Sequence, residues 1–228
     1  ARSLLVNSPN NPTGVVYDLA TWTDIAKVCQ NHNLWLISDE VYDTQVWAGH
    51  HISPRSLEGM EKRTLVIGSM SKSHAMTGSR VGWICGPETV IEQLINLATH
   101  TTYGVPGYIQ DAADFALNQG NEDELKVAAP FRRRRDIAMN LIAGQTVVRA
   151  VPCSGAMYMM LDIRATGLGG NAFAHALLDS RQIAVMPGES FGQSAAGHVR
   201  VAMTVNDDQF KQALGSLLAF ASKQNKTT

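Results

Sequence analysis

The chain has 228 residues, of which 45% are hydrophobic, and a formal net charge of −1. A chain of this length can bury a sizeable core in one or two domains. Its near-neutral charge argues against an extended surface for nucleic acid or for an anionic membrane. No apolar run in the sequence approaches the roughly 20 residues that a membrane span needs.

Short apolar runs alternate with amphipathic segments over the first 120 residues. Strands are expected at 3–7, 34–39, 64–69 and 81–85, and helices at 18–32, 88–100 and 106–119. Asp18 is the expected N-cap of the first helix, whose apolar face includes Leu19, Trp22 and Cys29. Strands that alternate with helices predict an α/β fold, with a mostly parallel sheet covered by helices on both faces.

A long helix is expected at 121–144, and Pro130 should kink or split it. It carries four consecutive arginines, at 132–135, which we interpret as a solvated face with one or two arginines turned inward. Beyond residue 145, strands at 146–151, 156–163, near 185 and 199–203 accompany helices at 171–181 and 207–222. This pattern predicts a small α+β C-terminal domain.

The chain has three cysteines, an odd number, at the widely separated positions 29, 85 and 153. Without a CxxC pair they favour neither a disulfide framework nor a zinc site, and they fit a reducing compartment. Apolar neighbours in the sequence predict that all three are core residues. No metal site is expected.

The segment 69–80 follows an apolar strand and combines Lys72 with small hydroxyl residues. At the mouth of a buried strand, water-excluding walls favour the neutral amine, which can condense with an aldehyde to form a Schiff base. Arg80 offers a planar fork for a phosphate, and Ser69 and Ser71 offer hydroxyl donors. An aldehyde that carries a phosphate suggests pyridoxal phosphate. The alternative is a strand end with a solvated lysine.

Two further segments support the same chemistry. A second buried strand runs into Asp39 and, three residues later, Tyr42; an aspartate can keep a pyridine nitrogen protonated, and a phenol can donate to a ring oxygen. Upstream, the prolines and the glycine of 7–14 form a rigid turn that fixes the amide of Asn11.

The motifs Asn11-Pro12-x-Gly14, Asp39-x-x-Tyr42, Ser69-x-Ser71-Lys72 and Arg80 together resemble the class I/II aminotransferases, pyridoxal-phosphate enzymes of the aspartate aminotransferase fold. The likeness continues through 185–188, 191–192 and 198–201, so it covers essentially the whole chain. A weaker resemblance, to bacterial arginine–pyruvate transaminases, is carried by 132–136, 161–168 and 194–198.

The resemblance implies a role for each matching residue. Lys72 would hold pyridoxal phosphate as a Schiff base and then act as the general base and acid. Asp39 would pair with the pyridinium nitrogen, while Tyr42 and Asn11 would bond the ring hydroxyl oxygen. Ser69 and Arg80 would bind the phosphate with Ser71 in a supporting role, and Arg200 would clamp the substrate α-carboxylate.

The chain also departs from the family. Whole family members carry a comparable length of chain before the first strand, so the sequence is expected to lack the N-terminal half, including a phosphate-binding turn and a ring-stacking aromatic residue. Residues 1–122 are then the C-terminal part of the large cofactor-binding domain, and 123–228 are the small domain. The fragment alone is expected to bind the cofactor poorly or not at all.

The resemblance implies transamination between an α-amino acid and a 2-oxo acid in a cytoplasmic homodimer, with no nucleic-acid or membrane partner. Two alternatives remain open. A β-eliminating lyase with the same site would release ammonia and pyruvate from cysteine conjugates without a 2-oxo acid. A non-catalytic effector sensor would need a further module, such as a DNA-binding domain, and the sequence offers none. A broad-specificity aspartate or aromatic enzyme is as compatible with the sequence as an arginine–pyruvate enzyme.

Overall fold

A computed structural model describes residues 1–225 of the chain. Contacts divide the chain into two compact units. The first consists of Ala1–Pro9 and Val16–Ala128, and the second of Asn10–Val15 and Ala129–Thr228. The boundary expected at 122/123, and the identity of the two parts as a large and a small domain, stay predictions; residues 226–228 lie outside the described part.

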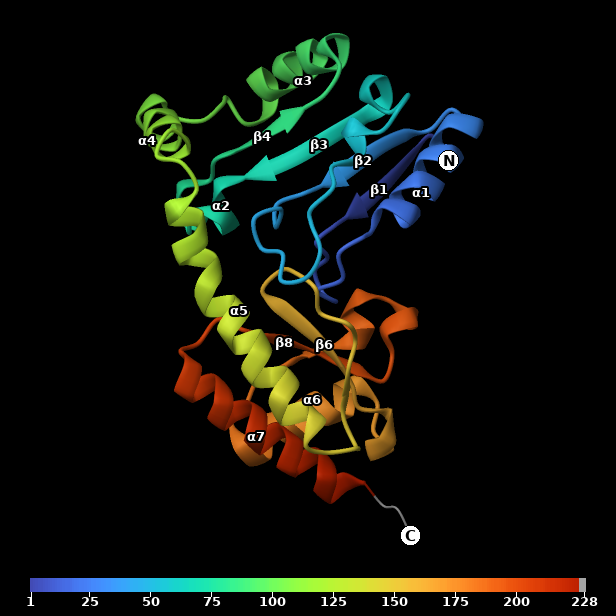
Figure 1. Ribbon diagram of the computed structural model, residues 1–228, viewed down its shortest axis with the longest axis vertical. Helices are drawn as coiled ribbons and strands as arrows, with labels where there is room; N and C mark the ends of the chain where they lie inside the picture. Colours follow the sequence, from blue (N-terminus) through green and yellow to red (C-terminus); the bar gives the residue numbers. More distant parts are fainter. Residues whose placement is uncertain (226–228) are drawn as a thin grey trace. The chain divides into compact units, whose positions relative to one another are not determined.

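The first unit contains a four-stranded sheet in the order β1 (Ser3–Asn7), β2 (Trp35–Asp39), β3 (Thr64–Ser69) and β4 (Gly82–Cys85). The first three strands run parallel and β4 runs antiparallel to β3 (Figure 1). The expected strands are therefore confirmed within one residue, and the sheet is mostly parallel. The register pairs Asn7 with Asp39, and Asp39 with Ile67.

Helix α1 (Leu19–Asn31) covers one face of β1 and β2. Asp18 is its N-cap, as expected, and accepts a hydrogen bond from the Thr21 amide at 2.8 Å. Trp22 and Cys29 are fully buried against Leu36 of β2. Leu19, which the sequence placed on this apolar face, is instead exposed, because it stands in the first turn of the helix, outside the buried cluster.

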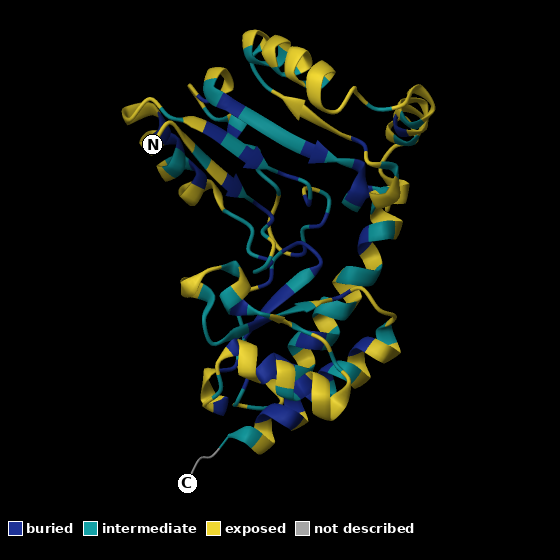
Figure 2. Ribbon diagram, turned by 180° about the vertical axis from the view of Figure 1, so that it is seen from behind, coloured by how far each residue is buried: buried dark blue, intermediate teal, exposed yellow. Residues whose placement is uncertain are grey.

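The other helices of the first unit are the one-turn α2 (Met70–Ser73), α3 (Glu88–Thr101) and α4 (Gly107–Leu117). Figure 2 shows that α3 and β4 are mostly exposed, and α3 has no buried residue. Cys85 is therefore exposed, because it ends an edge strand that no described element covers. The expectation of three core cysteines is wrong for Cys85 and confirmed for Cys29 and Cys153.

Helix α5 (Glu122–Ala143) continues through Pro130 as a single helix, so the proline does not split it. None of the helices within residues 1–225 has both the length and the apolarity needed to cross a bilayer.

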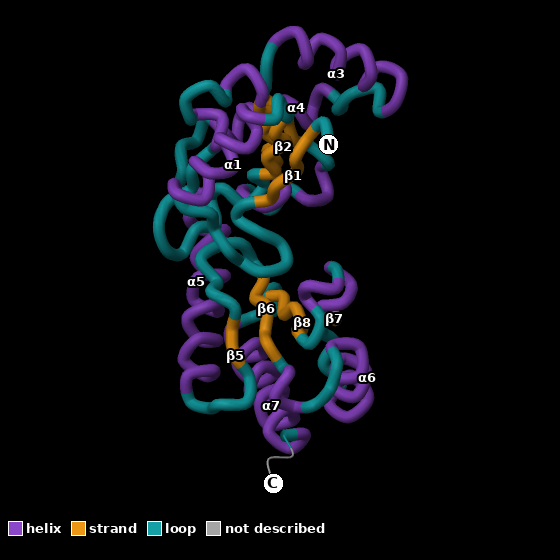
Figure 3. The backbone as a smooth tube through the Cα atoms, turned by 90° about the vertical axis from the view of Figure 1, so that its right-hand side faces the viewer, coloured by secondary structure: helices purple, strands orange, loops and turns teal. Residues whose placement is uncertain are grey.

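The second unit holds an antiparallel sheet in the order β5 (Arg149–Ala150), β6 (Tyr158–Asp162), β8 (His198–Ala202) and β7 (Met186–Pro187). Helices α6 (Gly170–Arg181) and α7 (Asp207–Gln224) complete it (Figure 3). The two helices pack through Phe173 and Phe220, whose rings meet edge to face with centroids 5.2 Å apart. The α+β character predicted for this region is confirmed.

The strand expected at 146–151 is only two residues long, Arg149–Ala150. The side-chain oxygen of Gln145 accepts hydrogen bonds from the amides of Val147 and Val148, at 2.7 and 2.8 Å. These amides are therefore not available to a sheet, and pairing begins only at Arg149.

The arginine run holds α5 to the start of α7. Arg134 donates to the Asp207 carboxylate and to the Met203 carbonyl, both at 2.8 Å, and its side chain is 12% exposed. Arg133 bonds the same carboxylate at 3.0 Å but is 58% exposed. Arg135 donates to the Cys153 carbonyl at 3.2 Å. The predicted inward turn of one or two arginines is confirmed.

Candidate active site

The carboxyl ends of the three parallel strands carry the polar residues of the first unit. β1 ends at Asn7, β2 at Asp39 and β3 at Ser69. The Asn7 side-chain amide and the Ser8 backbone amide both donate to the Asp39 carbonyl, at 3.0 and 3.1 Å. Because parallel strands end at one edge of a sheet, this edge is where a ligand crevice forms in open α/β sheets.

The Asp39 carboxylate is half-buried and accepts a hydrogen bond from the Val41 amide at 3.2 Å. Burial raises the pKa of Asp39 above its ordinary value, the Val41 amide opposes this shift, and the charge of Glu40 adds to it. Among residues 1–225, no lysine, arginine or histidine forms a salt bridge with this carboxylate. A cationic ring nitrogen placed against it would compensate the cost of burial.

Lys72 stands in the single turn of α2, which begins directly at the end of β3. Ser69 is the N-cap: its hydroxyl accepts from the Ser71 amide at 3.1 Å and donates to the Val81 carbonyl at 3.3 Å. Ser71 is buried. The strand-to-helix turn thus presents Lys72 one turn beyond the sheet edge.

A surface hollow of about 560 Å³ contains three of the residues expected to bind a phosphate, namely Ser69, Ser71 and Arg80. Arg80 has a left-handed backbone, with φ +54°, and its guanidinium donates to the Thr77 carbonyl at 2.8 Å. The fold therefore brings together a guanidinium and two hydroxyl groups that the sequence places up to eleven positions apart.

Tyr42 is buried in the turn that follows β2, and Gln45 is linked to it. The Gln45 amide donates to the Tyr42 carbonyl at 2.8 Å, and the Gln45 side chain donates to the Lys72 carbonyl at 3.1 Å. Sequence reasoning missed Gln45, because nothing in a single sequence distinguishes a buried glutamine from a surface one.

A buried polar cluster adjoins Asp39 in the sequence. Glu40 is 4% exposed. Its carboxylate is bonded by His51 Nε2 at 2.7 Å and by the Ser53 hydroxyl at 2.9 Å. The sequence pattern does not indicate this pairing. Its one signal is an acid, Glu40, directly after Asp39 at the end of an apolar strand.

In the second unit, Arg200 lies on β8 and bonds Asn11, whose side-chain oxygen is 3.0 Å from the guanidinium. The guanidinium lies over the ring of Tyr158, 4.3 Å from its centroid, and 5.0 Å from that of Phe191. The Nε of Arg200 is buried and has no hydrogen-bond partner among the described residues. Arg200 is thus a cation held between two aromatic rings.

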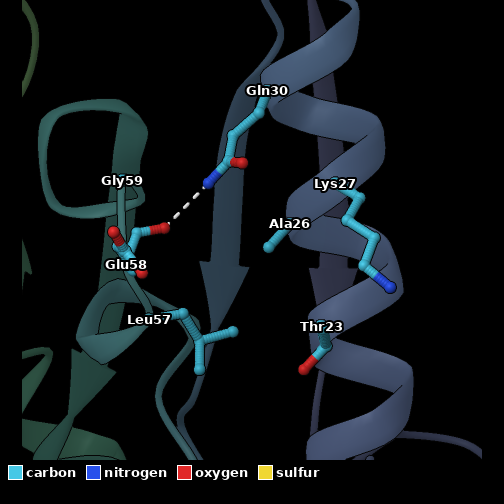
Figure 4. A pocket seen from close by; sticks show the side chains of 7 residues that line it. All are labelled: Thr23, Ala26, Lys27, Gln30, Leu57, Glu58 and Gly59. Carbon is cyan, nitrogen blue, oxygen red and sulfur yellow. Dashed lines mark hydrogen bonds between the residues drawn. The ribbon is translucent and has the colours of Figure 1, made fainter.

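The first unit has another hollow, of about 480 Å³, between α1 and the loop at 57–59 (Figure 4). Its one internal bond runs from the Gln30 side chain to the Glu58 carbonyl, at 2.7 Å. None of the expected site residues lines it; Lys27 points away from the loop at 57–59, and Gln30 reaches across to Glu58. We therefore do not include it in the candidate site.

The sequence profile of aminotransferase class I and II matches residues 1–217. The chain belongs to this family. The arginine–pyruvate transaminase of Pseudomonas aeruginosa is 44% identical over 212 residues, which are 93% of this chain and 54% of that enzyme. The aspartate/prephenate aminotransferase of Thermus thermophilus is 34% identical over 218 residues, or 93% of this chain and 54% of that protein.

Solved aminotransferases have the same fold. An aromatic aminotransferase from Pyrococcus horikoshii superposes with a TM-score of 0.91 at 32% identity, over 98% of this chain and 60% of its own. The aspartate aminotransferase of Thermus thermophilus with maleate gives 0.88 at 32% identity, over 97% and 56%. The α/β fold of the aspartate aminotransferase type is confirmed. The chain spans about half the length of the curated relatives it matches.

Aminotransferases of this family and fold use pyridoxal phosphate. The described residues fit this cofactor in two places. The half-buried Asp39 carboxylate forms no salt bridge within residues 1–225, and the Ser69–Arg80 hollow offers hydroxyl and guanidinium donors. Both features suit a molecule with a basic ring nitrogen and a phosphate.

Proposed function

We propose that the protein containing this chain transfers an amino group between an α-amino acid and a 2-oxo acid, using pyridoxal phosphate. The observation that carries the proposal is the edge of the parallel sheet. There, the adjacent strands β2 and β3 end in Asp39 and in the Ser69–Lys72 turn. An acid and a lysine that follow the ends of adjacent strands, with a hollow lined by Ser69, Ser71 and Arg80, are what this chemistry needs.

Each residue of the first unit has a task in this proposal. Lys72 holds the cofactor through its side-chain amine and moves a proton at that Nζ to and from the substrate α-carbon. Asp39 keeps the ring nitrogen protonated, and Tyr42 donates to the ring oxygen. Ser69, Ser71 and Arg80 hold the phosphate. When bound, pyridoxal phosphate supplies the electron sink that makes the α-proton acidic.

In the second unit, Arg200 clamps the α-carboxylate of the substrate, and Asn11 contacts the cofactor ring oxygen. A guanidinium suits this task because its planar fork matches the two carboxylate oxygens. Stacking between the Tyr158 and Phe191 rings limits the rotation of the Arg200 fork, so that less side-chain entropy is lost when a carboxylate binds.

The finer assignments belong to the same proposal. The amino donor and acceptor to assay first are arginine and pyruvate, since the Pseudomonas relative is named for that pair. We further propose a cytoplasmic homodimer, with residues 1–122 as part of the large cofactor-binding domain and 123–228 as the small domain.

The test is to incubate the protein, extended to the length of its relatives, with pyridoxal phosphate, reduce it with borohydride, and map the modified peptides by mass spectrometry. We expect the phosphopyridoxyl label on Lys72, and its loss in Lys72→Ala. Label scattered over exposed lysines such as Lys27, with none on Lys72, would reject the site. In the protein extended to the length of its relatives, ammonia and pyruvate release from cysteine conjugates without a 2-oxo acid would indicate β-elimination instead.

A further inference from the structure

The turn that carries Lys72 ends after four residues, so its carbonyl groups need partners from elsewhere. The Met70 carbonyl accepts from the amides of His74 and Met76, at 3.1 and 3.3 Å. The Ser71 carbonyl accepts from the Thr77 hydroxyl at 2.9 Å. Because Ala75 is left-handed, with φ +56°, the backbone turns away before any amide can reach the Lys72 carbonyl in helical fashion.

Gln45 supplies the missing donor from another part of the chain. Its side-chain nitrogen lies 3.1 Å from the Lys72 carbonyl oxygen, across 27 residues of sequence. The Gln45 residue is fully buried, and its own backbone amide is fixed by the Tyr42 carbonyl at 2.8 Å. One side chain therefore joins the turn after β2, which holds Tyr42, to the turn after β3, which holds Lys72.

We propose that Gln45 is a positioning residue that fixes the orientation of Lys72. The hydrogen bond sets the plane of the peptide that follows Lys72 and so restrains the backbone from which its side chain projects. Gln45 also sets the spacing between the Tyr42 turn and Lys72, because its backbone amide is bonded to the first and its side chain to the second. This inference rests on the proposed function, in which Lys72 holds the cofactor.

The hydrogen bonding of the Gln45 amide also indicates why a glutamine stands at this position. Its Oε1 is buried without a partner among the described residues, so the amide is held there by its donor side alone. An unsatisfied buried oxygen is costly, and a residue that only filled space would be better as an apolar one. The bond to the Lys72 carbonyl is therefore the interaction that favours an amide at this position.

Two variants and one control separate positioning from general stabilisation. Gln45→Met has nearly the same length and removes the donor. Gln45→Glu keeps a donor only while its carboxyl is protonated, which burial at this position favours. Gln145→Met is the matched control: Gln145 bonds the Ile142 and Val148 carbonyls, at 3.0 and 2.6 Å, in the second unit.

The first readout needs no cofactor. Amide hydrogen exchange of the peptide that covers 70–76 should be about fivefold or more faster in Gln45→Met, as expected from the loss of one buried hydrogen bond, and unchanged in Gln145→Met. The second readout, made in the protein extended to the length of its relatives, is the yield of borohydride-fixed label on Lys72 at limiting pyridoxal phosphate. It should fall by a similar factor in Gln45→Met and stay at the wild-type level in Gln145→Met.

Gln45→Glu supplies a pH-dependent signature of positioning over the pH range in which its circular dichroism stays that of the wild type, so that loss of fold is excluded. Its labelling of Lys72, relative to wild type at the same pH, should fall as the pH rises, because an ionised carboxylate cannot donate to the Lys72 carbonyl. This ratio decides the question if Gln45→Met fails to fold, as judged by circular dichroism.

The outcomes are distinct. Faster exchange with unchanged labelling would reduce Gln45 to a structural residue and overturn the inference, as would wild-type behaviour in both readouts. A wild-type protein, extended to the length of its relatives, that never labels Lys72 would reject the proposed function, and with it any role of Gln45 toward a cofactor lysine. The exchange data would still report whether Gln45 holds the turn.

Discussion

The buried Glu40 carboxylate allows a quantitative test of how the candidate site is held together. Glu40 is 4% exposed and has two partners, His51 at 2.7 Å and the Ser53 hydroxyl at 2.9 Å. Ser53→Ala removes one hydrogen bond to a charged group and should lower the free energy of unfolding by about 1.5–3 kcal/mol. His51→Phe leaves the buried charge with one partner and should cost about 3–5 kcal/mol.

Urea unfolding followed by tryptophan fluorescence is the suitable assay, because the tryptophans report on the first unit alone. They stand at positions 22, 35, 47 and 83. Glu40→Gln provides the control background: once the charge is absent, Ser53→Ala should cost less than about 1 kcal/mol. Equal costs in both backgrounds would show that the Ser53 hydroxyl does not act through the Glu40 charge, and a Ser53→Ala cost below about 0.5 kcal/mol would refute the argument outright.

Three further predictions concern other parts of the chain. Arg164 bonds Asp162 and lowers the pKa of that carboxyl from 3.8 to about 2, so the folded state binds fewer protons than the unfolded state between these pH values. Above pH 4 this shift should add about 1 kcal/mol to the free energy of unfolding, a figure reduced because Arg164 is exposed, and the contribution should be lost as the pH falls toward 2. Arg164→Gln should remove most of that pH dependence in unfolding followed by circular dichroism, while the backbone amide of residue 164 keeps its bond to Asp162. Arg134→Met should destabilise the second unit by about 2–3 kcal/mol and Arg133→Met by less than about 1 kcal/mol, because the Arg134 side chain is 12% exposed and that of Arg133 is 58% exposed. Equal losses would contradict this ranking. Iodoacetamide should modify Cys85 at least about tenfold faster than the two buried cysteines, in a mass-spectrometric time course at pH 8, and faster reaction of a buried thiol would contradict the packing.

Much of the local structure followed from periodicity and turn chemistry. Asp18 was identified as a cap because an aspartate preceded an amphipathic run, and the structure bears this out. The strand at 146–151 was overestimated, because the Gln145 side chain takes amides that the apolar pattern assigns to a sheet. The exposure of Cys85 was missed for a related reason: apolar neighbours in sequence do not reveal whether an element covers the strand.

The residues proposed to bind the cofactor were selected from the sequence by chemical type and spacing. That selection was possible because each group follows a strand directly in the sequence. The aspartate ends one strand, and the serine, lysine and arginine follow the neighbouring one. Their roles stay predictions. Partners that act across long separations, such as Gln45 toward Lys72 and His51 toward Glu40, had no local signal.

The sequence by itself determined the family, the alternation of strands and helices, and the residue types available for chemistry, because these depend on motifs and periodicities within a few turns of chain. Only the tertiary structure decided which side chains hold those groups in place. The bond from Gln45 to Lys72, the burial of Glu40 and the stacking of Arg200 between Tyr158 and Phe191 all join residues far apart in the chain. Such contacts arise from the packing of whole elements, which fixes distances that spacing along the sequence leaves open.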